Sequence, residues 1–312
     1  MLDILTIVLP VFMVVGAGYA AVYFKGFSGE YADGLMRFTQ TFAIPCLLFG
    51  AVARLDLATV FKPQILLPYY IGSTTCFILG IAGAILIFKR RKGEAVAVGF
   101  CAMFSNSVLL GLSIVERAYG AAAIETIVAI IAIHAPFCYI LGITTMELLR
   151  ADGRRLDQTA FIVIKAIFSN GLMIGLLLGF LVNLSGLAIP GSLNSAIEMI
   201  SRAALPAALF GLGGVLVRYG LRNNIGEVAM IAAIRLVVHP LIALFLAHQV
   251  FGLAPEITSV IVLTAAMSPG VNVYVFANMY DRAKGTAASS ILISTVLAVF
   301  SVSIWIKILA TL

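Results

Sequence analysis

The chain has 312 residues, of which 62% are hydrophobic and 11% are charged, and its formal net charge is +6. A soluble domain has roughly 25% charged residues, so this composition excludes an ordinary soluble fold and predicts a protein that lies in a lipid bilayer. In that setting basic cytoplasmic loops account for the positive charge. We therefore expect no nucleic-acid partner.

Ten apolar runs are long enough to cross the hydrocarbon core, which needs about 20 residues per helix. In chain order they cover residues 4–24, 33–53, 64–88, 95–115, 122–149, 160–183, 194–217, 226–250, 257–280 and 286–310. Polar or turn-rich segments separate them. The first run follows Asp3 instead of a basic leader, so we interpret it as a retained helix. The pattern predicts an all-α, multi-pass membrane protein with ten transmembrane helices.

The basic residues indicate how these helices are oriented, because cytoplasmic loops are enriched in Lys and Arg. With both termini outside the cytoplasm, 14 of the 20 basic residues fall at cytoplasmic ends and five at external ends, with Arg235 inside a run. The 14 are Lys25, Arg37, Lys89, Arg90, Arg91, Lys92, Arg150, Arg154, Arg155, Lys165, Arg218, Arg222, Arg282 and Lys284. We expect an inner-membrane protein with both termini outside the cytoplasm.

Two short motifs recur at nearly the same spacing. Residues 44–50 read Ile-Pro-Cys-Leu-Leu-Phe-Gly, and residues 205–211 read Leu-Pro-Ala-Ala-Leu-Phe-Gly. Residues 116–120 and 281–285 share an acidic residue followed by Arg-Ala and a Gly. A duplicated unit of five helices enters the membrane from opposite sides, so we predict two inverted repeats, 1–150 and 151–312. We interpret Pro45 and Pro206 as kinks where helices cross.

The fourth and ninth runs carry polar and helix-breaking residues near their middle. These are Ser105, Asn106 and Ser107 in the fourth run and Ser268, Pro269, Gly270 and Asn272 in the ninth. Unwound backbone is tolerated in a membrane only where protein or a wet cavity satisfies it. The starts of half-helices carry unpaired N–H groups and partial positive charge, which favour a carboxylate. We therefore predict that these seven residues bind an anionic substrate. The alternative is a pair of structural kinks.

Two further polar residues lie inside apolar runs. Arg235 lies in the eighth run with His239 and Pro240 one turn later, and His134 precedes Pro136 in the fifth. A buried charge needs a partner, and either residue could act in gating or coupling or be satisfied structurally. The four cysteines show no metal-binding spacing. No HExxH, GxSxG or P-loop motif occurs, so we expect no enzyme, no ATP-driven pump and neither metal nor cofactor.

These residues together resemble the auxin efflux carrier family and its bacterial malonate- or malate-permease members. The resemblance spans nearly the whole chain. It is carried by Ile44-Pro45 with Phe49, Ser105-Asn106-Ser107 with Gly111 and Tyr119-Gly120, Leu205-Pro206 with Phe210-Gly211, and Pro269-Gly270 with Val275-Phe276-Ala277 and Tyr280.

The resemblance implies a specific architecture and mechanism. Helices 1, 2, 6 and 7 would form a scaffold that makes a homodimer, and helices 3–5 and 8–10 would form a transport domain that moves like an elevator. Broken helices 4 and 9 would cross at the substrate, with Asn106 at the position of the family's substrate-contacting asparagine. We expect a secondary or potential-driven carrier of small carboxylates. The alternative is a sodium-coupled organic-anion symporter of the bile-acid type.

Overall fold

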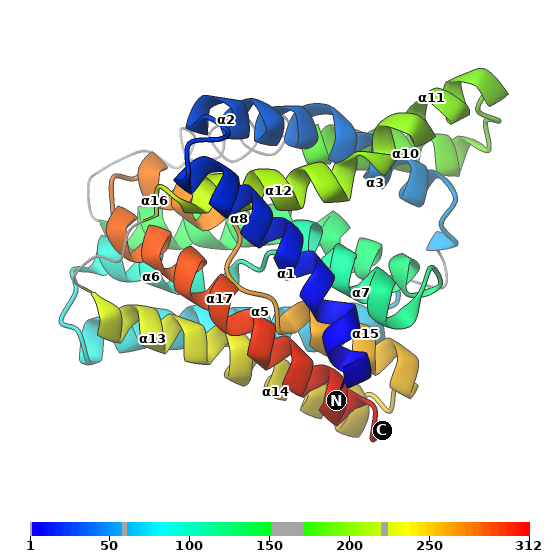
Figure 1. Ribbon diagram of the computed structural model, residues 1–312. Coiled ribbons are helices and arrows are strands. Elements are labelled where there is room, and N and C mark those ends of the chain that lie inside the picture. The colour runs from blue at the N-terminus through cyan, green and yellow to red at the C-terminus, as the bar shows by residue number, and fades with distance from the viewer. Residues whose placement is uncertain (1, 58–60, 151–170, 220–223) are drawn as a thin grey trace. The chain divides into compact units, whose positions relative to one another are not determined.

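The computed structural model describes residues 2–57, 61–150, 171–219 and 224–312. These residues are helical, with no β-strand assigned among them beyond one isolated bridge. Figure 1 shows the labelled helices. The chain separates into two compact units, the first with residues 1–8, 62–163 and 219–312 and the second with residues 9–61 and 164–218.

Unit 1 contains the central and C-terminal helices. They are α5 (Pro63–Leu86), α6 (Lys92–Met103), the π-helical turn η2 (Ser107–Gly111), α7 (Leu112–Tyr119), α8 (Ala123–Arg150), α13 (Ile225–Ala233), η3 (Ile234–Val238), α14 (His239–Leu244), η4 (Phe245–Val250), α15 (Pro255–Ala265), α16 (Asn272–Met279) and α17 (Lys284–Leu309). Helix α5 packs along α6, α14 against α5 and α15, and α17 against α13 (Figure 1).

Unit 2 contains the helices of the two remaining chain segments. They are most of α1 (Leu2–Tyr23), then α2 (Gly29–Phe38), the π-helical turn η1 (Thr39–Ala43), α3 (Ile44–Ala53), α10 (Gly171–Ser185), α11 (Gly191–Arg202) and α12 (Ala204–Leu216). Helix α10 packs on α3, and α12 packs on α2.

Seven helical runs in the described chain are long and apolar enough to cross a membrane. They cover Thr6–Tyr23, Gly29–Ala53, Pro63–Leu86, Ala123–Leu149, Gly191–Leu216, Ile225–Val250 and Lys284–Leu309. The expected spans 95–115 and 257–280 each contain two shorter helices, and 160–183 is described only from Gly171. The first part of that span lies outside the described residues. So do four of the basic residues that were assigned to cytoplasmic ends, namely Arg154, Arg155, Lys165 and Arg222. The part of the chain that the structure describes thus contains seven membrane-capable helices.

The two prolines expected to kink helices lie near helix starts in unit 2. Pro45 is the second residue of α3, directly after η1. A Cβ on Gly175 would collide with the backbone of Pro45, so α10 lies directly against α3 there. Pro206 is the third residue of α12, and Ala203 separates α12 from α11. A proline ring clashes with the carbonyl four residues earlier, here that of Arg202, the last residue of α11.

Two glycines in unit 2 allow helices to approach closely. A Cβ on Gly18 of α1 would collide with the carbonyl oxygen of Phe210 in α12. A Cβ on Gly179 of α10 would lie 2.9 Å from the carbonyl oxygen of Phe49 in α3. Adding 161 to the residue number takes Gly18 to Gly179 and Phe49 to Phe210. The contact of Gly18 with Phe210 therefore corresponds to the contact of Gly179 with Phe49, with the two halves of the chain exchanged.

Candidate functional site

The first part of the site is an interruption between α6 and α7. Helix α6 ends at Met103, and the chain becomes helical again at Ser107, where η2 begins. The segment between them carries Ser105 and Asn106, whose short polar side chains compete with the helical hydrogen bonds of the backbone. The sequence therefore weakens the helix at this point.

The second part is an interruption between α15 and α16. Helix α15 ends at Ala265, and α16 begins at Asn272. Pro269 lacks an N–H group and disfavours helical geometry at Ser268, the residue before it. Gly270 then allows a close approach, because a Cβ there would lie 3.3 Å from the carbonyl oxygen of Ser105.

The two interruptions meet in an antiparallel bridge between Ser105 and Pro269. The N–H of Asn106 donates to the carbonyl oxygen of Ser268 at 2.9 Å, and the N–H of Gly270 donates to that of Phe104 at 3.2 Å. Each interruption thus satisfies backbone groups that the other leaves without helical partners, as the interior of a membrane protein requires.

Arg235 joins the C-terminal ends of the two half-helices. Its side chain is completely buried and donates to the carbonyl oxygens of Met103 at 3.1 Å, Ala265 at 3.3 Å and Met267 at 3.1 Å. Met103 ends α6, while Ala265 ends α15 and Met267 follows it. The C-terminus of a helix carries a partial negative charge, so the guanidinium neutralises two such ends at once.

Two histidines and a tyrosine complete this arrangement. His239 Nδ1 lies 2.8 Å from Arg235 Nη1, and His239 Nε2 lies 3.1 Å from the carbonyl oxygen of Tyr69. Since Arg235 can only donate, His239 accepts at Nδ1 and carries its proton on Nε2. His134 Nε2 accepts the N–H of Ser105 at 3.0 Å. Tyr69 Oη lies 3.5 Å from His134 Nδ1.

Of the two residues expected in gating or coupling, Arg235 contacts both interruptions and His134 contacts the first. The sequence analysis missed the contributions of His239 and Tyr69 to this network. The sequence already placed His239 one turn after Arg235, and this spacing could have predicted their contact, because residues four apart lie on the same face of a helix. Tyr69 gave no such signal.

The surroundings of the N-terminal ends of the half-helices differ from those of their C-terminal ends. Helix η2 starts at Ser107 and α16 at Asn272, and such starts carry partial positive charge and N–H groups without intrahelical partners. Asn106, which is 4% exposed, has a buried side-chain nitrogen that makes no hydrogen bond to a described residue, and the same holds for the hydroxyl of Ser107. Asn272 is partly buried.

The hydroxyls of the other two predicted serines are already engaged. Ser105 Oγ donates to the carbonyl oxygen of Thr264 at 3.1 Å, and Ser268 Oγ lies 3.1 Å from Thr295 Oγ1. The structure therefore brings five of the seven predicted residues together, namely Ser105, Asn106, Ser268, Pro269 and Gly270. It assigns the side chains of Ser105 and Ser268 to the protein framework. Among the predicted side chains, the amide nitrogen of Asn106 and the hydroxyl of Ser107 are buried without a hydrogen bond to a described residue.

Comparison with known proteins gives consistent matches over the whole chain. Residues 3–306 match the model of a family described as "Membrane transport protein". A "Putative malonate transporter" of Rhizobium meliloti is 25% identical over 306 residues, which cover 97% of this chain and 95% of that protein. The "Uncharacterized transporter YfdV" of Escherichia coli K12 is 24% identical over 96% of this chain and 95% of its own. An "Uncharacterized transporter" of Methanothermobacter thermautotrophicus is 27% identical over 96% of each chain.

Proposed function

The chain belongs to the membrane transport protein family, as the resemblance to auxin efflux carriers predicted, and on that premise we propose that this multi-pass transporter carries small carboxylates. The proposed substrates are dicarboxylates such as malonate or malate. The name of the Rhizobium meliloti relative supports this class. Proposed localisation is the inner membrane with both termini outside the cytoplasm, which the basic loops support.

The asymmetry of charge at the bridge carries this proposal. Arg235 neutralises the C-terminal ends of α6 and α15, whereas no described carboxylate is buried at the N-terminal starts of η2 and α16. Among described residues the one buried acidic side chain is Glu227, which is bound to Arg90. Two positive helix starts, the amide of Asn106 and the hydroxyl of Ser107 therefore offer donors to an anion.

We propose that the chain forms ten transmembrane helices in two inverted repeats. The exchange of the Gly18–Phe210 and Gly179–Phe49 contacts under a shift of 161 residues supports a two-fold relation between the halves. The bridge adds a second argument, since Ser105 and Pro269 are 164 residues apart and meet each other. Under this relation the two interrupted helices cross at the substrate.

The division of the chain supports an elevator-like mechanism. Unit 1 contains the helices expected as 3–5 and 8–10, and unit 2 contains those expected as 1, 2, 6 and 7. Because the bridge, Arg235 and both histidines belong to unit 1, the whole site could move as one body. We propose that unit 1 carries the anion and that unit 2 is the scaffold through which two copies associate.

The position of Arg235 favours sodium-independent transport over a sodium-coupled symporter. A sodium ion near the interruptions would need the carbonyl groups that the half-helix C-termini offer. The guanidinium of Arg235 already binds the carbonyl oxygens of Met103, Ala265 and Met267. A fixed cation thus supplies the charge that a coupling ion would bring.

Uptake by purified protein in liposomes tests the proposed function. We expect uptake of labelled malonate or malate that is unchanged when choline replaces sodium and is strongly reduced in Asn106→Ala. A panel of carboxylic acids, including indole-acetate, should be screened first by thermal shift, because a ligand that binds only the folded state raises the melting temperature. Folded protein that neither binds nor transports any organic anion contradicts the proposal.

A further inference from the structure

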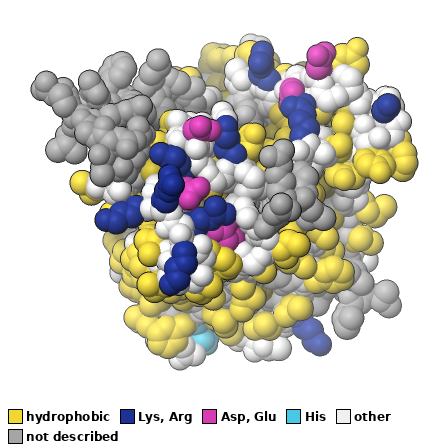
Figure 2. Space-filling view, turned by 90° about the vertical axis from the view of Figure 1, so that its left-hand side faces the viewer, with side chains coloured by type: hydrophobic (Ala, Val, Ile, Leu, Met, Phe, Trp, Pro, Cys, Tyr) yellow, Lys and Arg dark blue, Asp and Glu magenta, His cyan; other side chains and the backbone are white. Residues whose placement is uncertain are grey.

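A second basic feature lies at one end of unit 1, away from the bridge. Figure 2 shows Lys and Arg side chains gathered on a face of the molecule, next to an area of hydrophobic side chains. In unit 1 the run Lys89-Arg90-Arg91-Lys92 connects α5 to α6. A pocket of about 490 Å³ lies at this run and at the start of α13. Its volume is in the range of small-molecule sites, about 300–1,000 Å³.

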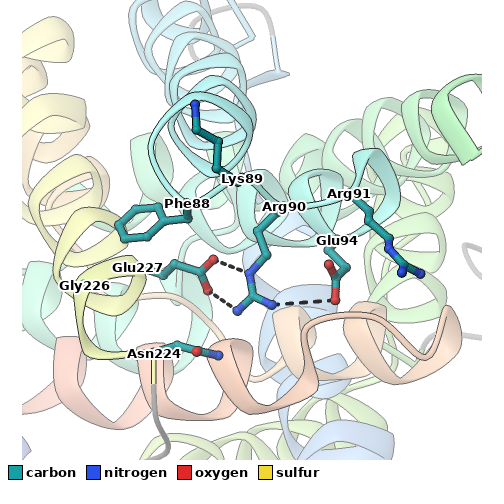
Figure 3. Close-up of a pocket in the computed structure, with 8 residues that line it drawn as sticks. All are labelled: Phe88, Lys89, Arg90, Arg91, Glu94, Asn224, Gly226 and Glu227. Atoms are coloured by element: carbon teal, nitrogen blue, oxygen red, sulfur yellow. Dashed lines mark hydrogen bonds and ion pairs between the residues drawn. The ribbon is translucent and has the colours of Figure 1, made fainter.

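The carboxylates of this pocket are already paired with one of its arginines (Figure 3). Glu227, which is 2% exposed, accepts from Arg90 Nε at 2.5 Å and from Arg90 Nη2 at 3.0 Å, and also from Thr286 Oγ1 at 2.9 Å. Glu94 Oε1 lies 3.7 Å from Arg90 Nη1. The ion pair fixes Arg90 and leaves the charges of its neighbours uncompensated.

Lys89 and Arg91 supply the uncompensated charge. Both line the pocket and are exposed, and neither makes an ion pair with another described residue. In Figure 3 their side chains extend on either side of Arg90 and point away from Glu94 and Glu227. Helix α6 begins next to them at Lys92 without a side-chain cap, so its positive end adds to the field.

Exposed apolar side chains stand next in the chain to residues that line this pocket. Leu86 and Ile87 at the end of α5 are 67% and 68% exposed, and Ile225, the first residue of α13, is 68% exposed. The ring of Phe88 lines the pocket against Gly226, where a Cβ would come within 2.9 Å of it. A soluble anion gains nothing from these side chains, whereas the glycerol and acyl groups of a lipid would cover them.

We propose that this pocket holds the phosphate of one anionic phospholipid, which the charges of Lys89 and Arg91 on its two sides attract, with Leu86, Ile87 and Ile225 against its acyl chains. Basic residues directly beside a membrane helix attract anionic lipids at the level where hydrocarbon gives way to water. Lys89 and Arg91 follow Leu86, the last residue of α5, by three and five residues. The pocket therefore matches a ligand that is anionic at one end and apolar at the other.

Titration of the full-length protein in neutral detergent with phosphatidylglycerol or phosphatidylcholine tests this site. Native mass spectrometry counts the bound lipid, and the melting temperature reports its effect. We expect one phosphatidylglycerol to bind tighter than phosphatidylcholine. Since a basic residue near the surface contributes about fivefold in affinity, Lys89→Gln with Arg91→Gln should weaken phosphatidylglycerol binding about tenfold or more. Lys62→Gln with Lys307→Gln, which removes two exposed charges elsewhere in unit 1, should change nothing.

Three results would overturn the proposal. They are equal binding of both lipids, equal weakening in the control pair, and the same stabilisation by inorganic phosphate or glycerol phosphate alone, which would identify a soluble anion. Both variants leave the Arg90–Glu227 ion pair intact. If the first variant does not fold, Lys89→Arg with Arg91→Lys keeps both charges and must retain the preference for phosphatidylglycerol.

Discussion

At the scale of single residues, Asn106 is the side chain that most directly distinguishes a binding site from a structural kink. Its side-chain nitrogen is buried and makes no hydrogen bond to a described residue. Removing it therefore leaves no protein partner unsatisfied. A hydrogen bond to a charged group contributes about 1.5–3 kcal/mol, which corresponds to roughly tenfold to 100-fold in affinity.

We predict that Asn106→Ala weakens carboxylate binding by about tenfold to 100-fold at an unchanged melting temperature. Isothermal titration or thermal shift with the best ligand measures the loss. Asn272→Ala should act in the same direction. Ser113→Ala is the control, because that buried hydroxyl only donates to the carbonyl oxygen of Leu109 in its own helical run. Normal binding by both asparagine variants would place the substrate elsewhere.

Arg235 should behave in the opposite way, as a residue on which the fold itself depends. Arg235→Met leaves the carbonyl oxygens of Met103, Ala265 and Met267 without their donor. A buried group left unsatisfied costs about 1–3 kcal/mol, so we predict a loss of about 3 kcal/mol or more in stability, together with loss of transport. Thermal unfolding in detergent measures it. Arg235→Lys keeps the charge and should retain more stability than the methionine variant; a melting temperature unchanged in both would contradict this role.

Residue types in the sequence were enough to predict where the two helices are interrupted but not the contacts made there. Ser, Asn, Pro and Gly in the middle of apolar runs indicated where helices 4 and 9 would be weak. Whether a given hydroxyl faces a ligand or a neighbouring helix depends on tertiary packing. The bonds from Ser105 to Thr264 and between Ser268 and Thr295 join residues that only the folded chain brings together.

At the scale of helices, the close approaches of unit 2 give a test of the repeat. A glycine in a helix normally costs about 1 kcal/mol relative to alanine, so Gly→Ala stabilises a helix where space is free. Gly16 has open space, whereas a Cβ at Gly18 or Gly179 would meet a carbonyl oxygen of a facing helix.

We predict that Gly18→Ala and Gly179→Ala each destabilise the protein by about 1–3 kcal/mol, the usual cost of overpacking. Gly16→Ala, two residues from Gly18 in the same helix, should be neutral or stabilising. Equivalent positions in a repeat should respond alike, so similar losses at Gly18 and Gly179 are the expected result. Thermal unfolding of the three variants compares them, and a stable Gly179→Ala beside a destabilised Gly18→Ala would count against the two-fold relation.

The apolar runs predicted helix positions well but not helix continuity. The expected span 194–217 contains both α11 and α12, which Ala203 separates. The span 226–250 contains the π-helical turns η3 and η4. Hydropathy reports how apolar a segment is, whereas these local departures depend on how each turn packs, so periodicity alone could not reveal them.

At the scale of the whole molecule, the proposed carrier moves charge across the membrane. Arg235 stays with unit 1, and no described buried carboxylate compensates the anion at the bridge. One charge moved through 100 mV is worth about 2.3 kcal/mol, which corresponds to roughly fiftyfold accumulation of a univalent anion.

We therefore predict that an imposed potential, positive inside the liposomes, increases accumulation of labelled malonate about fiftyfold per 100 mV for each net negative charge that crosses, if no proton or sodium ion is coupled. Valinomycin with a potassium gradient sets the potential, and Asn106→Ala provides the background. Accumulation that ignores the potential, or that follows a pH or sodium gradient instead, would exclude uniport.

The most direct test of the central claim is an experimental density map of the protein in lipid with a bound dicarboxylate such as malonate. We predict two interrupted helices that meet at Ser105 and Pro269, with the anion between the starts of η2 and α16 and within hydrogen-bonding distance of the Asn106 side chain. Continuous helices through both segments, or an anion bound away from this bridge, would contradict the account.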